Sequence, residues 1–166
     1  MEKTPKYVVD TCSFATLKRV YPPDVVPGAW DAISEMADSG IIISSHEIYL
    51  EIEAQDDGIY EWARNHQDIF VPLEDSIQVK ATEILRDYPN ILDLRQLKSS
   101  ADPFLIATAM VKSCSVVTEE QPTGPGSKII KIPNVCRSLN VTCISLLDLL
   151  RAEGVRLNFS RPENKQ

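Results

Sequence analysis

The sequence of 166 residues lacks any long apolar run. A membrane-spanning helix needs about 20 consecutive apolar residues, and the longest apolar stretches fall well short of that length. The first residues lead into no apolar signal-peptide core and no small-residue cleavage site. We therefore expect a cytoplasmic protein that has no membrane partner.

Histidine and cysteine are scarce, with two and four residues. No Cys-x-x-Cys pair is present, and the spacing matches no zinc ribbon or finger. Cys114 and Cys143 lie in apolar, strand-like surroundings and are predicted to be small core residues. Cys12 has no assignable His or Asn partner, so we favour packing over a reactive thiol for it.

Positive charge is outnumbered, since 17 Lys and Arg face 24 Asp and Glu to give a formal net charge of -7. An acidic surface argues weakly against non-specific binding to nucleic acid, because it repels phosphates. It does not exclude a nuclease with a carboxylate site, because bound metal ions invert the local charge. Acidity also suits a basic partner.

What the chain does contain is an alternation of strand-like and helical segments. Short β-branched runs predict strands at 7–10, 41–43, 115–118 and 141–144. Helical patterns predict helices over 12–20, 28–39, 44–54, 74–88, 102–112, 133–139 and 145–154, with a further helical segment near 59–63. This alternation predicts an α/β fold with three layers, α/β/α, around a central mostly parallel sheet.

The chain is long enough for one domain, which we place at residues 1–154, followed by a polar C-terminal tail at 155–166. Residues 90–100 fit no element, and residues 121–127 form a loop rich in Pro and Gly. Three helix starts carry capping patterns, namely Ser44-x-x-Glu47, Asp102-Pro103 and Ser145-x-x-Asp148.

Acidic residues stand where a parallel sheet would bring them together. Asp10 ends the first predicted strand, Glu119 and Glu120 follow the third, and Asp102 begins a helix. The carboxyl ends of parallel strands share one edge, where ligands bind in open α/β sheets. Glu51 could reach this edge from the helix that follows the second strand. The topology could therefore gather these carboxylates in one cleft.

Such a cluster has a definite chemistry. Close carboxylates repel one another and raise each other's pKa, and a divalent cation removes that cost. Mg²⁺ and Mn²⁺ prefer carboxylate and water oxygens, and can activate water at a phosphoryl centre. The cluster thus favours phosphodiester hydrolysis. Taken singly, Asp102 could be a helix cap, Glu51 a solvated charge, and Glu119 and Glu120 ordinary loop acids. A buried Asp10 would need a partner.

The order of these acids resembles the PIN-domain family, particularly its VapC-like toxin ribonucleases. The matching pieces cover nearly all of residues 6–152: Val8-Val9-Asp10-Thr11, Ser45-x5-Glu51, Asp102-x-x-Leu105-Ile106-Ala107-x-Ala109, Val116-Val117-Thr118-Glu119-Glu120 and the segment from Val141 to Leu150. The resemblance implies a PIN-like fold and a metal-dependent endoribonuclease that hydrolyses RNA, as the toxin of a type II toxin–antitoxin pair.

Carried over by position, the resemblance implies that Asp10, Glu51 and Asp102 are catalytic ligands of Mg²⁺ or Mn²⁺. Glu120 takes the place of a fourth acid that is commonly Asp, and the choice between Glu119 and Glu120 stays open. The implied supporting residues are Thr11, Ser13, Thr118 and Glu119.

The resemblance also implies a homodimer through the early helices and a basic antitoxin along the cleft. Candidate cations for contacts to the RNA backbone are Lys18, Arg19 and Lys128. The RNA target, the number of metal ions and the role of the loop at 121–135 stay open.

Three other functions compete with the nuclease. The first is a non-catalytic PIN-like module that binds RNA or protein, as the net charge would allow. The second is a haloacid-dehalogenase-type phosphatase, which needs a second Asp where this chain has Cys12. The third is a receiver domain, whose phosphoacceptor Asp ends a later strand than Asp10 does. The last two fit the sequence poorly.

Overall fold

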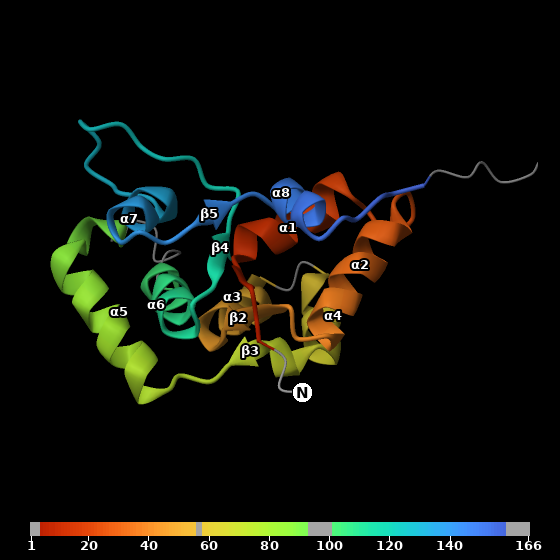
Figure 1. Cartoon of the computed structure of the whole chain (residues 1–166), viewed down its shortest axis with the longest axis horizontal. Helices are drawn as coiled ribbons and strands as arrows, with labels where there is room; N and C mark the ends of the chain where they lie inside the picture. Colours follow the sequence, from red (N-terminus) through yellow and green to blue (C-terminus); the bar gives the residue numbers. More distant parts are fainter. Residues whose placement is uncertain (1–3, 56–57, 93–100, 159–166) are drawn as a thin grey trace, which may run out of the picture.

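A parallel sheet of five strands forms the centre of the computed structural model, which describes residues 4–55, 58–92 and 101–158 (Figure 1). The strand order is β3-β2-β1-β4-β5, and all neighbouring strands are parallel. The strands are β1 (Tyr7–Val9), β2 (Ile42–Ser45), β3 (Phe70–Val71), β4 (Ser115–Val117) and β5 (Cys143–Ile144). In the register of the central strands, Tyr7 lies opposite Ile42 and Ser115.

Helices cover both faces of this sheet, giving the expected three-layer α/β/α architecture. The α-helices of the described residues are α1 (Thr11–Val20), α2 (Pro27–Asp38), α3 (His46–Gln55), α4 (Ile59–Asn65), α5 (Asp75–Asp87), α6 (Asp102–Lys112), α7 (Ile132–Ser138) and α8 (Leu146–Ala152). Figure 1 shows α5, α6 and α7 on one side, and α1, α2, α4 and α8 on the other. The loop from β4 to α7 runs along one edge of the molecule.

The core explains why the strand sequences are apolar without alternation. Val8, Ile42, Val116 and Val117 are fully buried, because helices cover both faces of a parallel sheet. On α6, Leu105, Ile106, Ala107 and Ala109 are buried almost completely, so this helix is apolar around most of its circumference. The site-bearing strands are therefore held in a packed interior.

Four strand predictions are confirmed with shifts of one or two residues, but the sequence interpretation missed β3. This strand has only two residues and Pro72 follows it directly, so the short apolar run Ile69-Phe70-Val71 was not assigned to a strand. Two short 3-10 helices also went unpredicted, η1 (Gln67–Ile69) and η2 (Pro89–Ile91). The rest of the unassigned segment, 93–100, lies outside the described residues.

The helix starts correct two of the three capping predictions. Ser44 lies in β2, and its hydroxyl donates to the Val9 carbonyl at 2.6 Å. Ser45 instead accepts the Ile48 N–H at 3.4 Å, so the cap of α3 lies one residue later than predicted. Asp102 is the first residue of α6 rather than its cap, and makes no side-chain capping bond. Only the Ser145 cap is as predicted, since it accepts the Asp148 N–H at 3.1 Å.

The chain continues to contact the core beyond α8. Val155 and Leu157 are partly buried against it, and the Val155 N–H donates to the Leu150 carbonyl at 2.9 Å. Within the described ranges, no helix combines the length and apolar character needed to cross a membrane.

Candidate functional site

Asp10 emerges at the carboxyl end of β1, where the residue is only 5% exposed. It stands in the N-cap position of α1 but makes no capping bond, so its side chain is available for other partners. The carboxylate accepts the Thr118 hydroxyl at 2.7 Å and the Cys12 thiol at 2.8 Å. Burial raises the pKa of Asp10, and these hydrogen bonds oppose that shift without cancelling it.

Glu51 lies on α3 and contacts Thr11, the residue next to Asp10. Its Oε2 accepts the Thr11 hydroxyl at 2.7 Å. Its Oε1 is buried, and no hydrogen-bond partner for it is found among the residues that the structure describes. Burial raises the pKa of Glu51 and the charge on Asp10 adds to that shift, whereas the Thr11 hydroxyl and the backbone N–H of Ala101 oppose it. A buried carboxylate oxygen without a partner costs free energy unless a proton or cation joins it.

Asp102 begins α6 and faces the other acids. Burial raises its pKa to about 8, and the charges on Asp10, Glu120 and Glu51 contribute in that order. Lys131 acts in the opposite direction. The pKa of this one side chain thus responds to three carboxylates from separate elements, so the other three acids all lie near enough to Asp102 for their charges to act on it.

Glu120 and Glu119 follow β4, and the structure gives them different roles. The Glu120 carboxylate accepts Lys131 Nζ at 2.7 Å and the Ile132 N–H at 3.1 Å, and it acts on the pKa of Asp10 and Asp102. The Glu119 carboxylate accepts the Leu146 N–H at 2.7 Å, at the start of α8. Of the two, Glu120 is the one that belongs with the acid cluster.

The supporting residues divide in the same way. Thr118 binds Asp10, whereas Thr11 binds Glu51 rather than its neighbour Asp10. Ser13 was expected to support the first acid, but its buried hydroxyl donates to the Val117 carbonyl at 3.2 Å. Ser13 therefore ties α1 to β4. This structural role could not be predicted from the position of Ser13 near Asp10 in the sequence.

Two residues near the acids were missed by sequence reasoning. Cys12 was assigned to packing, yet its thiol contacts Asp10 and accepts the Glu119 N–H at 3.2 Å. Burial raises its pKa, and so does the charge on Asp10, so it stays a thiol and a donor. Lys131 lies in the Pro- and Gly-rich loop region, where no local pattern points to an acid partner.

The other sequence candidates lie at the surface. Lys18 and Arg19 are exposed near the end of α1, and Lys128 is exposed in the loop after β4. Cys114 is buried as expected, while Cys143 is only partly buried and lines a pocket.

The donor set fits a hard divalent cation. Asp10, Glu51, Asp102 and Glu120 supply only oxygen atoms, which Mg²⁺ and Mn²⁺ prefer, and one of those oxygens is a buried atom without a partner. In residues 4–55, 58–92 and 101–158, no three His, Cys, Asp or Glu side chains stand close enough to hold one ion as they lie. Glu120 is turned towards Lys131 instead.

Comparison with protein families identifies the chain at this point. Residues 7–157 match the family model described as a domain of unknown function, DUF4411. The chain belongs to this family. The DUF4411 match includes all four acids of the cluster, from Asp10 to Glu120, and ends at Leu157, which packs against the core. No curated protein matched the chain.

Proposed function

We propose that this DUF4411 protein is a metal-dependent endoribonuclease of the PIN-domain type, which hydrolyses RNA phosphodiester bonds. The observation that carries the proposal is the response of Asp102 to its neighbours. Its pKa of about 8 reflects burial together with three other carboxylates, and few structural roles need four neighbouring acids that are all buried or partly buried. The resemblance of the sequence to PIN-domain nucleases supports the same function.

In this proposal, Asp10, Glu51, Asp102 and Glu120 hold Mg²⁺ or Mn²⁺. When bound, the ion supplies activation of water and stabilisation of charge on the phosphoryl group. Thr118 and Cys12 fix the direction of the Asp10 carboxylate, and Thr11 fixes that of Glu51. Without metal, the Asp102 carboxyl holds a proton at neutral pH, and metal binding releases it. No side chain of the cluster needs to act as a nucleophile.

We further propose that the enzyme acts in the cytoplasm as the toxin of a type II toxin–antitoxin pair, as a homodimer. A net charge of -7 suits a basic antitoxin segment. These proposals depend on the resemblance to VapC-like ribonucleases and on charge.

One observation favours a second candidate, a PIN-like module that binds RNA or protein without cleaving it. The fourth acid, Glu120, already has two partners, Lys131 and the Ile132 N–H. An internal cation can replace part of what a metal ion would do for the cluster. In a nuclease, Glu120 must either leave Lys131 to bind the metal ion or bind the ion while this contact remains.

Cleavage of RNA by the purified protein tests the proposal. We expect cleavage with Mn²⁺ and none with EDTA. Asp10→Asn should lower the rate by more than about 100-fold, since losing only a second-layer partner of a metal ligand costs up to about that factor. Asp31→Asn, an exposed position on α2, is the matched control and should cleave normally. Cleavage that survives both Asp10→Asn and EDTA would refute the metal-dependent mechanism.

A further inference from the structure

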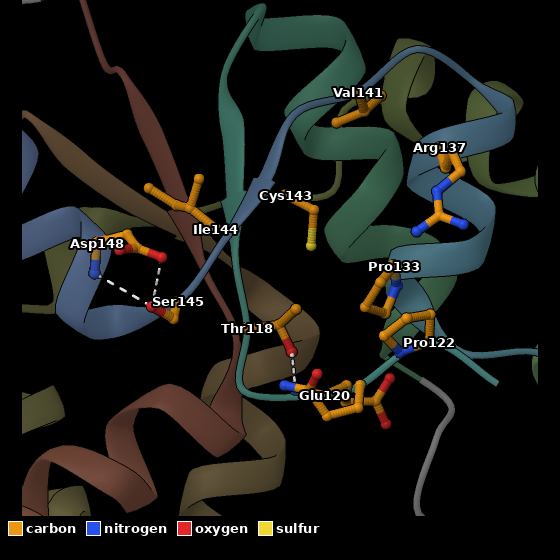
Figure 2. Close-up of a pocket in the computed structure, with 11 residues that line it drawn as sticks. Thr118, Glu120, Pro122, Pro133, Arg137, Val141, Cys143, Ile144, Ser145 and Asp148 are labelled. Atoms are coloured by element: carbon orange, nitrogen blue, oxygen red, sulfur yellow. Dashed lines mark hydrogen bonds between the residues drawn. The ribbon is translucent and has the colours of Figure 1, made fainter.

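A pocket of about 450 Å³ lies beside the acid cluster, between the loop after β4, strand β5 and helix α7 (Figure 2). Thr118 and Glu120 belong to both, since they line the pocket and also contact or influence Asp10. Its volume lies in the range of sites that bind small molecules, roughly 300–1,000 Å³. A ligand in this pocket would therefore be adjacent to the acids.

The charges in the wall of the pocket are unequally compensated. Glu120 is paired with Lys131 at 2.7 Å. Asp148 is paired with Arg151 at 2.9 Å and accepts the Ser145 hydroxyl at 2.9 Å. The guanidinium of Arg137, in contrast, has no hydrogen-bond or ion-pair partner in the part of the chain that the structure describes, although its backbone carbonyl accepts the Asn140 N–H.

Arg137 is placed to act on a bound ligand. Figure 2 shows its guanidinium extending from α7 along the pocket, on the side of Cys143 and Pro133. Since both carboxylates of the lining already have cationic partners, the positive charge of Arg137 is what the pocket offers to a ligand. A guanidinium with free N–H groups binds a phosphate oxygen pair well.

The wall opposite β5 is fixed in place rather than loose. The Asn134 side chain accepts the Thr123 N–H at 2.9 Å and donates to the Thr123 carbonyl at 2.9 Å. These bonds tie the loop to α7 just after Pro122, which lines the pocket together with Pro133. Two proline rings thus give the pocket a preformed apolar surface next to its cation.

From this combination we infer that the pocket binds one nucleotide of the RNA substrate, with Arg137 contacting a phosphate and Pro122 and Pro133 contacting the sugar or base. The inference rests on the proposed function, since it places this nucleotide next to the phosphodiester at the acids. The antitoxin segment proposed above is basic, and Arg137 would repel it, so RNA is the better occupant. Arg137 then positions the substrate through its phosphate, while the contacts of Pro122 and Pro133 influence which nucleotide is accepted.

Binding of a labelled single-stranded RNA, measured by fluorescence anisotropy, tests the inference. All proteins carry Asp10→Asn so that the RNA survives in the presence of Mn²⁺. Adding Arg137→Gln should raise the Kd roughly tenfold, the typical effect of losing a charged hydrogen bond. It should also reduce the dependence of log Kd on log salt concentration by about one.

The matched control is Arg86→Gln, which removes the same charge from an exposed site on α5 outside the pocket. Its Kd should stay within about twofold of the parent protein, because it lies outside the pocket. Equal effects of the two substitutions would refute the pocket, and so would an absence of RNA binding in the parent.

A second measurement on the protein without Arg substitutions distinguishes a nucleotide site from a simple phosphate site. Uridine 5′-monophosphate should shift the backbone amide resonances of Gln121 and Cys143, which line the pocket. Inorganic phosphate at the same concentration should shift them much less, and equal shifts would contradict contacts to the sugar and base. If the wild type does not cleave RNA but Arg137→Gln still raises the Kd for RNA, the nuclease proposal is refuted and the nucleotide pocket is retained.

Discussion

Asp102 shows how its surroundings, rather than its local sequence, determine the chemistry of a single residue. The local sequence, Asp102 before Pro103, predicts a helix cap, but Asp102 makes no capping bond and is the first residue of α6. Its pKa of about 8 comes from burial and from carboxylates that lie far away in the sequence. Sequence reasoning placed Asp102 in the cluster through topology and resemblance, and could not foresee its protonation.

This pKa predicts how stability depends on pH in the absence of metal. The folded-state pKa of Asp102 lies above its unfolded value, so the stabilisation is present at low pH and is lost as pH rises towards about 8. Asp10 and Glu51 shift in the same direction. In EDTA, we expect the Tm of the wild type to fall by several degrees between about pH 5 and about pH 8.

Asp102→Asn is the variant that isolates this effect. Its Tm should fall less over the same pH interval, and it should exceed the Tm of the wild type at the upper end, because one buried charge is gone. Thermal melting followed by circular dichroism gives both values. Parallel pH profiles for the two proteins would contradict the assignment of this proton to Asp102.

Thr118, the residue directly after β4, hydrogen-bonds both Asp10 and Glu120. Its hydroxyl donates to Asp10 at 2.7 Å while also accepting the Glu120 N–H at 3.2 Å. Thr118→Val keeps the shape but leaves both groups without that partner. We expect a loss of about 1–3 kcal/mol in the free energy of unfolding, measured with urea. Thr118→Ser, which keeps the hydroxyl, should lose much less, and equal losses would show that packing rather than hydrogen bonding matters here.

At the scale of elements, the two acids after β4 differ because they meet different helices. Glu119 accepts an N–H at the start of α8, and Glu120 accepts one at the start of α7 while remaining near Asp102. The sequence left the choice between them open, because local sequence does not tell which of two adjacent side chains after a strand points towards the other acids. That direction is set by where α7 and α8 pack.

Mn²⁺ affinity distinguishes the two acids. Glu120→Gln should weaken Mn²⁺ binding by about tenfold or more, because a carboxylate ligand is lost. Glu119→Gln should change it by less than about twofold, because its carboxylate is directed to α8. Both variants keep an oxygen that can accept the backbone N–H, so both should fold. The reverse order of effects would make Glu119 the fourth acid.

Sequence patterns predicted elements well where they are long, and poorly where they are short. The apolar runs at Val8–Val9 and Val116–Val117 indicate buried strands unambiguously. The apolar run at β3 is short and ends at Pro72, and the pairing of β3 with Ser44 and Ser45 depends on tertiary contacts. The same holds for the capping of α3, where two adjacent serines offer the same local chemistry and only the sheet register separates them.

For the whole molecule, topology is what brings acids that are distant in the sequence near one another. β1 and β4 are adjacent and parallel, so Asp10 and Glu120 emerge at the same edge. The alternation of strands and helices was sufficient to predict this arrangement. The alternation could not predict that Lys131 pairs with Glu120, because this contact depends on the conformation of the loop between Glu120 and α7.

Calorimetric titration with Mn²⁺ tests whether Asp10, Glu51, Asp102 and Glu120 form one metal site. The wild type should show saturable binding, accompanied by proton release near pH 7 because Asp102 holds a proton before the metal binds. Asp10→Asn should abolish this binding, and Asp31→Asn should leave it intact. Absence of saturable binding in the wild type, or unchanged binding in Asp10→Asn, would contradict such a site.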